Sequence, residues 1–174
     1  MEVEVKYRLA CEELKTVERK LEELGFKFVI EKLEEDLYFN SPVRDFGKSD
    51  EALRLRRDNE GVKLTYKGRK LDSTTKTREE LTVNVSDFEE MKKILGRLGF
   101  VPVGKVRKKR KVYRQGDVVA CLDVVEELGC FIEFEIDVED PKEVENSKCR
   151  LAEIASKMGV EGSITKSYLE MLIF

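Results

Sequence analysis

Charged and apolar residues alternate in several short segments of this 174-residue chain. The pattern opens at once, because residues 2, 4, 6 and 8 are ionised while residues 3, 5 and 7 are apolar or aromatic. Ionised residues recur at the same period in residues 53–56, 108–110 and 131–137. In a β-strand, alternate residues lie on opposite faces. Each segment is therefore predicted to be a strand with a charged face, and the fold must accommodate several such faces.

The charge composition is extreme but balanced. Charged residues make up 40% of the sequence, compared with about 25% in an average globular domain. Such a composition is typical of hyperthermophile proteins, in which ion-pair networks cost less to desolvate. The 33 basic and 36 acidic residues leave a net charge of -3, so the chain as a whole has no field that would attract nucleic acid or an anionic membrane.

The hydrophobicity pattern predicts a folded, cytoplasmic protein. A hydrophobic content of 41% is enough to form a core. No segment approaches the roughly 20 consecutive apolar residues of a membrane span, and the charged start of the sequence lacks the apolar core of a signal peptide. We therefore expect neither a nucleic acid nor a membrane as partner.

Two residue types limit the available chemistry. The chain contains no histidine, which excludes Ser-His-Asp and Cys-His nucleophiles and HExxH zinc sites. Catalysis would have to use carboxylates, lysine, tyrosine or a metal. The four cysteines, Cys11, Cys121, Cys130 and Cys149, have neither the spacing of zinc ligands nor the density of a secreted disulfide scaffold. We expect all four to be reduced.

The remaining patterns predict one α+β domain over residues 1–174. Apolar residues at helical spacing predict helices over residues 11–24, 86–98 and 141–158, the second of them starting with a Ser86–Glu89 capping box. Residues 43–51 read as a polar connection, and residues 168–174 as a last short strand or helix. Nine segments read as strand, over residues 1–8, 26–30, 37–39, 52–57, 62–67, 78–85, 106–114, 118–125 and 131–138, and about eight antiparallel strands are expected from them.

The charged faces admit two arrangements. An open sheet could leave them in water, as antiparallel sheets often do. A closed barrel would instead enclose them, and three features favour it. Charges of one sign gather on each strand, arginine rows match phosphate while carboxylate rows match Mg²⁺ or Mn²⁺, and three helices can cover the apolar faces from outside. A metal-bound polyphosphate would suit such an interior.

Several motifs together resemble one known family. Residues 2–6, Glu-Val-Glu-Val-Lys, are similar to the ExExK signature of the CYTH superfamily, the triphosphate tunnel metalloenzymes. That superfamily includes class IV adenylyl cyclases and thiamine triphosphatases. The likeness continues in order through residues 36–39, 53–56, 64–68, 78–80, 108–110, 122–123, 128–135 and 166–168. The resemblance implies an eight-stranded antiparallel β-barrel, or tunnel, with a charged interior and flanking helices.

The resemblance also implies roles for individual residues. Mg²⁺ or Mn²⁺ would be the cofactor, and its ligands would be Glu2, Glu4, Asp123, Glu133 and Glu135. The triphosphate ligands would be Lys6, Arg54, Arg56, Lys67, Arg78, Lys108, Arg110 and Lys166. Catalysis would involve Lys6, Tyr38 and Lys67, because phosphatase members use a Tyr and Lys pair, although Tyr38 could equally be an ordinary strand residue. Thr82 departs from the acidic alternation of some relatives.

Three functions are compatible with this lining. The segments around Tyr38 and Glu133 look most like class IV adenylyl cyclases, which convert ATP to cyclic AMP and pyrophosphate. The alternative is a triphosphatase that hydrolyses tripolyphosphate, thiamine triphosphate or a nucleoside triphosphate. The third is a non-catalytic protein that binds polyphosphate or nucleotide. In each case the expected partner is a small-molecule triphosphate, and edge strands or the helix at 141–158 could support a homodimer.

Overall fold

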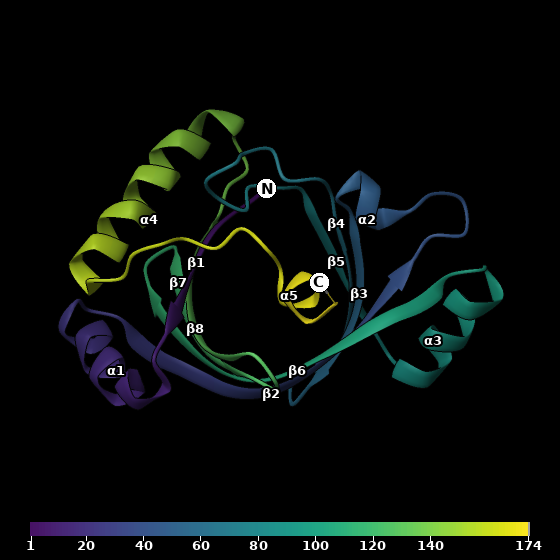
Figure 1. Ribbon diagram of the computed structural model, residues 1–174, viewed down its shortest axis with the longest axis horizontal. Helices are drawn as coiled ribbons and strands as arrows, with labels where there is room; N and C mark the ends of the chain where they lie inside the picture. Colours follow the sequence, from purple (N-terminus) through teal and green to yellow (C-terminus); the bar gives the residue numbers. More distant parts are fainter. Residues whose placement is uncertain (174) are drawn as a thin grey trace.

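A single curled antiparallel sheet of eight strands dominates the computed structural model, which describes residues 1–173 (Figure 1). The strand order is β1-β8-β7-β6-β2-β3-β4-β5. The strands are β1 (Glu2–Leu9), β2 (Lys27–Asn40), β3 (Ala52–Asp58), β4 (Gly61–Lys67), β5 (Glu80–Val85), β6 (Val101–Gln115), β7 (Val118–Val125) and β8 (Gly129–Asp137). The long strands β2 and β6 pair along nearly their whole length and form the floor of the curl (Figure 1).

Five α-helices and two 3₁₀ turns accompany the sheet. The helices are α1 (Leu14–Glu23), α2 (Phe46–Ser49), α3 (Phe88–Arg97), α4 (Val144–Met158) and α5 (Tyr168–Ile173), and the turns are η1 (Cys11–Glu13) and η2 (Pro141–Glu143). Figure 1 shows α1, α3 and α4 outside the curl, whereas α5 lies within its concave side. Among residues 1–173, no helix combines the length and apolarity that a membrane crossing requires.

The two ends of the sheet are joined through the segment before β5. The amide of Glu2 donates to the carbonyl oxygen of Arg78 at 3.0 Å, and the amide of Arg78 donates back to Glu2 at 3.1 Å. The amide of Lys76 donates to the carbonyl of Glu4 at 2.9 Å. These bonds connect β1 to residues 76–78, so the edges of the sheet meet around a hollow. The predicted eight-stranded antiparallel tunnel fold with flanking helices is confirmed, in the form of a curled sheet.

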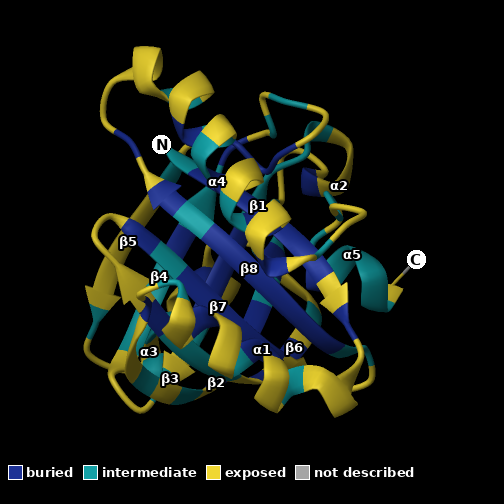
Figure 2. Cartoon of the chain, turned by 90° about the vertical axis from the view of Figure 1, so that its left-hand side faces the viewer, coloured by how far each residue is buried: buried dark blue, intermediate teal, exposed yellow. Residues whose placement is uncertain are grey.

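Two apolar clusters lie on the convex side of the sheet, under α1, α3 and α4. Leu21 of α1 and Leu151 of α4 are fully buried against β-strand residues such as Val3 and Phe134. A second cluster places Leu95 of α3 over the apolar face of β2 and β3. Figure 2 shows β1, β7 and β8 largely buried, while the outer surfaces of α1 and α4 are exposed. Because the helices cover the apolar faces, the charged faces are left on the concave side.

Several predicted boundaries are wrong. Residues 27–30 and 37–39 belong to one strand, β2, because residues 31–36 between them also pair with β6. β6 likewise begins at Val101, and β5 begins at Glu80. The polar connection at 43–51 contains the short helix α2. The cap of α3 is Asp87, which accepts a hydrogen bond from the amide of Glu90 at 2.9 Å, and not Ser86.

The prediction of four reduced cysteines is also wrong. Cys11 and Cys130 form a disulfide across a sequence separation of 119 residues. The register of β1 on β8 explains the pairing, because Leu9 lies opposite Cys130 and the chain turns into η1 two residues later. Cys121 and Cys149 are free, the first buried and the second exposed. The disulfide fastens the start of the α1 segment to β8.

We predict that removing this crosslink lowers stability. Cys11→Ala should reduce the free energy of unfolding by about 2–4 kcal/mol, because a crosslink over a long loop restricts the unfolded chain. Guanidinium denaturation without reductant would measure the loss. Cys149→Ala, at the exposed free cysteine, is the matched control and should leave stability unchanged. Equal stability of Cys11→Ala and wild type would contradict the crosslink.

Candidate active site in the charged tunnel

The hollow inside the sheet is one cavity of about 510 Å³. Strand register accounts for its charged lining, since Glu4 on β1 lies opposite Glu135 on β8, and Asp36 on β2 lies opposite Arg56 on β3. Every residue predicted for the site lines this cavity except Asp123 and Lys166. The structure therefore brings together residues that are separated by more than a hundred positions in the chain.

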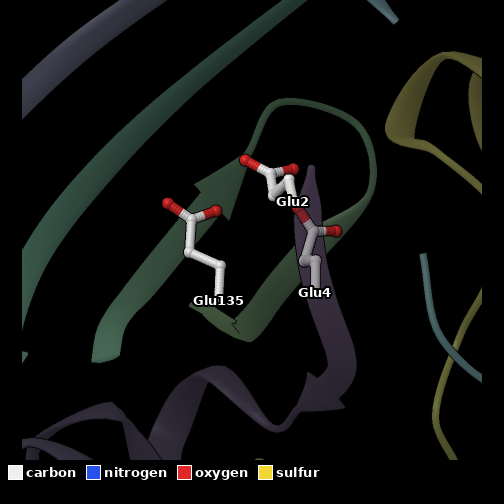
Figure 3. Close-up of side chains that lie close together, drawn as sticks. All are labelled: Glu2, Glu4 and Glu135. Atoms are coloured by element: carbon white, nitrogen blue, oxygen red, sulfur yellow. The ribbon is translucent and has the colours of Figure 1, made fainter. Parts of the chain in front are cut away.

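Three glutamates converge at one place in the cavity (Figure 3). Glu2, Glu4 and Glu135 each offer a carboxylate oxygen, and the three oxygens lie within 4.8 Å of one another. Burial, followed by the charge of Glu4, raises the pKa of Glu135 to about 7. Burial also raises the pKa of Glu2 well above its usual value, and it outweighs the opposing effect of Lys67. These carboxylates repel one another in the absence of a cation.

The donor set fits a hard divalent cation. Mg²⁺ and Mn²⁺ prefer carboxylate oxygens, and Glu4 Oε2 is buried without a hydrogen-bond partner among the described residues. Lys76 Nζ lies 3.5 Å from that oxygen, which is a contact between opposite charges and not a hydrogen bond. A bound cation would replace the repulsion among the three carboxylates with coordination. Three of the five predicted metal ligands thus lie together in a group that could hold a cation, and their role as ligands stays a prediction.

Lys67 lies beside this acidic cluster. Its Nζ is 3.6 Å from Glu2 Oε1 and 3.4 Å from Glu80 Oε2. Burial would lower the pKa of Lys67, but the neighbouring carboxylates outweigh it and hold the pKa above its usual value. Burial alone would raise the pKa of Glu80, but Lys67, Glu2 and Arg54 together lower the pKa of that carboxyl to about 2. Lys67 is therefore a fixed positive charge next to the carboxylates.

A second group of charges pairs internally. Asp36 accepts two hydrogen bonds from the Arg56 guanidinium, at 2.6 and 2.8 Å, and a third from Lys108 Nζ at 2.9 Å. Glu34 lies 3.2 Å from both cations. Burial alone would raise the pKa of Glu34, but Arg110, Lys108 and Arg56 lower it to about 2. Arg56 and Lys108, both predicted triphosphate ligands, thus have carboxylate partners in the protein.

A third group surrounds Arg110. Its guanidinium donates two hydrogen bonds to Asp123, both at 2.7 Å, and one to Glu133 at 3.0 Å. The Tyr168 hydroxyl donates to Asp123 Oδ2 at 2.6 Å, an oxygen that also accepts from Arg110 Nη2. Asp123 and Glu133 lie outside the three-glutamate cluster, where the structure pairs them with cations. Their assignment as metal ligands and that of Arg110 as a triphosphate ligand remain predictions.

Lys6 is enclosed by the C-terminal segment. Its Nζ is 3.6 Å from Glu133 Oε1, 3.8 Å from the centre of the Tyr168 ring, and donates to the carbonyl of Lys166 at 3.1 Å. The side chain is 1% exposed, and burial lowers its pKa well below the usual value. Lys166 contributes its carbonyl here, and the residue itself is exposed.

Arg54 is the least satisfied cation of the tunnel. It is 9% exposed, its Nε has no hydrogen-bond partner in the part of the chain that is described, and its Nη2 reaches only Thr65 Oγ1, at 3.5 Å. A buried guanidinium without a full set of acceptors is costly. Arg78, in contrast, donates to the carbonyls of Gly68 and Asp50, at 2.6 and 3.0 Å. Arg54 is therefore best placed to receive an anion.

Sequence reasoning missed several residues of the site. Glu34 and Asp36 precede Tyr38 at period two, so the alternation was available to identify them, but the residues before 37 were not read as strand. Lys76 lies in an irregular loop and carries no periodic signal. Tyr168 was part of a recognised motif, but its contacts with β1 and β7 depend on how the C-terminal segment folds back into the curl (Figure 1).

Comparison with known proteins agrees with this geometry. The family model for the CYTH domain matches residues 1–168. A protein of Methanocaldococcus jannaschii that carries the provisional name of an adenylate cyclase is 40% identical over 171 residues, which cover 97% of this chain and 98% of the relative. The adenylate cyclase CyaB of Aeromonas hydrophila is 27% identical over 172 residues, which cover 96% and 86%.

A solved structure gives the same result. A protein from Pyrococcus horikoshii is 40% identical, covers 99% of this chain and 98% of its own, and superposes with a TM-score of 0.90. The two proteins thus share one fold. This chain belongs to the CYTH domain family, and the resemblance inferred from its motifs is confirmed.

We predict that the three-glutamate cluster binds a divalent cation. Glu135→Gln should weaken Mn²⁺ binding at pH 7 by about tenfold or more, because it removes one charged ligand while preserving shape. Isothermal titration calorimetry with Mn²⁺ alone would measure this. The control is Asp137→Asn, two residues along β8, whose side chain is 90% exposed. Unchanged Mn²⁺ affinity in Glu135→Gln would remove that residue from the site.

We also predict acid-dependent stability from the internal ion pairs. The pKa of Glu34 is about 2 in the folded protein against an ordinary value of 4.5, so its contribution is present above pH 4.5 and is lost as the pH falls towards 2. The shift corresponds to about 3 kcal/mol. Glu34→Gln should flatten the dependence of unfolding free energy on pH in this range. Glu31→Gln, at an exposed residue of the same strand, should not.

Proposed function

We propose that this protein is a metal-dependent enzyme that acts on a triphosphate, and that its reaction is the cyclisation of ATP to cyclic AMP and pyrophosphate. The observation that carries the proposal is the presence, in one cavity, of three converging carboxylates and a buried, unsatisfied arginine. A cation site and an anion site next to each other are what a metal-bound triphosphate requires. The adenylate cyclase names of two relatives favour cyclisation.

The chain's own residues would perform three tasks. Glu2, Glu4 and Glu135 would hold the cation, which neutralises phosphate oxygens when bound. Arg54 and Lys67 would bind triphosphate oxygens and stabilise the charge that moves to the leaving group. The tunnel walls would hold the ribose 3'-hydroxyl in line with the α-phosphorus, so that a bond to the 3'-oxygen forms as the bond to pyrophosphate breaks.

Hydrolysis is the second candidate. Tyr38 and Lys67 both line the cavity, and the family resemblance associates such a Tyr and Lys pair with phosphatase members. In that reaction a water molecule would attack the terminal phosphorus, and orthophosphate would be released. The same cation and anion sites would serve both reactions, so the products distinguish them.

Product analysis tests the proposal. The purified protein is incubated with Mg²⁺ or Mn²⁺ and, separately, with ATP, thiamine triphosphate and tripolyphosphate. We expect cyclic AMP and pyrophosphate in equal amounts from ATP. Orthophosphate from ATP or from the other two compounds would instead identify a triphosphatase. Binding without any product would identify a non-catalytic binder and overturn the enzymatic proposal.

Two arginines on β3 provide a matched pair for the same assay. Arg54→Gln should lower kcat/KM for the triphosphate by about a hundredfold, the upper end of what one charge-assisted contact contributes. Arg57→Gln is the control, because Arg57 lies on the outer face and pairs with Glu35 at 3.0 Å. Equal activity of Arg54→Gln and Arg57→Gln would exclude Arg54 from the anion site.

A further inference from the structure

Lys76 is a cation of the tunnel that comes from a loop and not from a strand. The loop, residues 68–79 between β4 and β5, passes beside the N-terminus and the start of α4 (Figure 1). Lys76 lines the cavity and is 7% exposed. A buried ammonium group is costly unless an opposite charge offsets it. The groups that surround Lys76 therefore decide what this residue does.

Backbone hydrogen bonds hold Lys76 against β1. Its amide donates to the carbonyl oxygen of Glu4 at 2.9 Å, within the segment 76–78 that pairs with the start of β1. An ion pair between Asp72 and Lys148 connects the outer part of the loop to α4. The Lys76 backbone is thus fixed beside one of the three glutamates of the cluster.

The Lys76 ammonium group also faces the carboxylate of Glu4. Its Nζ lies 3.5 Å from Glu4 Oε2, and both side chains are buried. No other ion pair to Glu4 forms among the described residues. After burial, the charge of Lys76 is the largest effect that lowers the pKa of Lys6, so these two ammonium groups lie close enough to repel each other. Lys76 therefore neutralises Glu4 but is not held there by a short hydrogen bond.

A divalent cation at the three-glutamate cluster would meet this ammonium group. The three carboxylate oxygens lie within 4.8 Å of one another, so a cation among them would contact Glu4. Repulsion between like charges at such short distances is strong inside a protein. The cation would have to overcome the charge of Lys76 or displace its side chain, and it would bind more weakly than the carboxylates alone allow.

We propose that Lys76 is a built-in counter-ion of the cation site, which neutralises Glu4 in the metal-free tunnel and limits the affinity of the cluster for a free divalent cation. Lys76 acts through Glu4 and is not itself a ligand of the cation. One positive charge thus stabilises the metal-free protein and opposes metal binding. This inference rests on the proposed function, because it assumes that the three-glutamate cluster is the cation site.

Two substitutions that remove the charge test this role. Lys76→Met retains a long side chain, and Lys76→Gln also retains a polar end. Arg69→Met is the matched control, because it removes one positive charge from the same loop, at an exposed residue outside the cavity lining. Calorimetry at pH 7 measures the binding of Mn²⁺ without any triphosphate. Chemical denaturation measures the free energy of unfolding with and without Mn²⁺.

We expect both Lys76 variants to bind Mn²⁺ about tenfold more tightly than wild type, because the opposing charge is gone. Without metal, the same variants should be less stable than wild type, and saturating Mn²⁺ should reduce this difference. Arg69→Met should bind Mn²⁺ within about twofold of wild type, because salt screens an exposed charge. In a Glu4→Gln background, the gain in affinity from Lys76→Met should be smaller.

Lower stability without tighter Mn²⁺ binding would give Lys76 a purely structural role and overturn the inference. The cation site would then still stand, because Glu135→Gln tests it separately. Failure of both Lys76 variants to fold even with saturating Mn²⁺ would also overturn the inference, since a bound cation should replace the missing charge. Absence of Mn²⁺ binding by wild type and by both variants would overturn the cation site itself, and with it the proposed function.

Discussion

The structure depends on the pairing of charges that the curled sheet encloses. Asp36 accepts hydrogen bonds from both Arg56 and Lys108. Asp123 accepts hydrogen bonds from both Arg110 and Tyr168. Removing one partner of such a group would leave an uncompensated buried charge, which is strongly destabilising. The tunnel can therefore exist only because acids from β2, β7 and β8 meet bases from β3 and β6.

The need of each buried charge for a partner distinguishes charges that are already paired within the protein from charges that a ligand could bind. Most cations of the interior already have carboxylate partners, so a ligand would have to compete for them. The three-glutamate cluster and Arg54 are different, because the first combines like charges and the second lacks acceptors. An anionic ligand with a bound cation would supply both, because the cation would bind the three glutamates and the anion would bind Arg54. Arrangement, and not the number of charges, thus defines the candidate site.

Sequence patterns were sufficient to predict several charged strand faces and the family. Alternation identified the charged faces of β1, β3 and β8, and the ordered motifs identified the family. The same alternation failed on β2, where six consecutive residues from Glu31 to Asp36 include only one apolar side chain, Leu33. Such a run reads as a polar loop, yet it is held as a strand because it pairs with β6 on one side and, in part, with β3 on the other. The Cys11–Cys130 disulfide was missed for a similar reason, since strand register and not sequence spacing brings its cysteines together.

By itself, the sequence determined which residues share a face, because side-chain direction in a strand follows from position alone. It also favoured an enclosed arrangement of the charged faces, in which the charges would need partners or ligands. Only the tertiary structure decided which acid meets which base, since those contacts join residues as far apart in the chain as Lys6 and Glu133 through the curvature and register of the sheet. For that reason Glu2, Glu4 and Glu135 lie together as a candidate cation site, while Asp123, equally acidic in sequence, is the partner of an arginine.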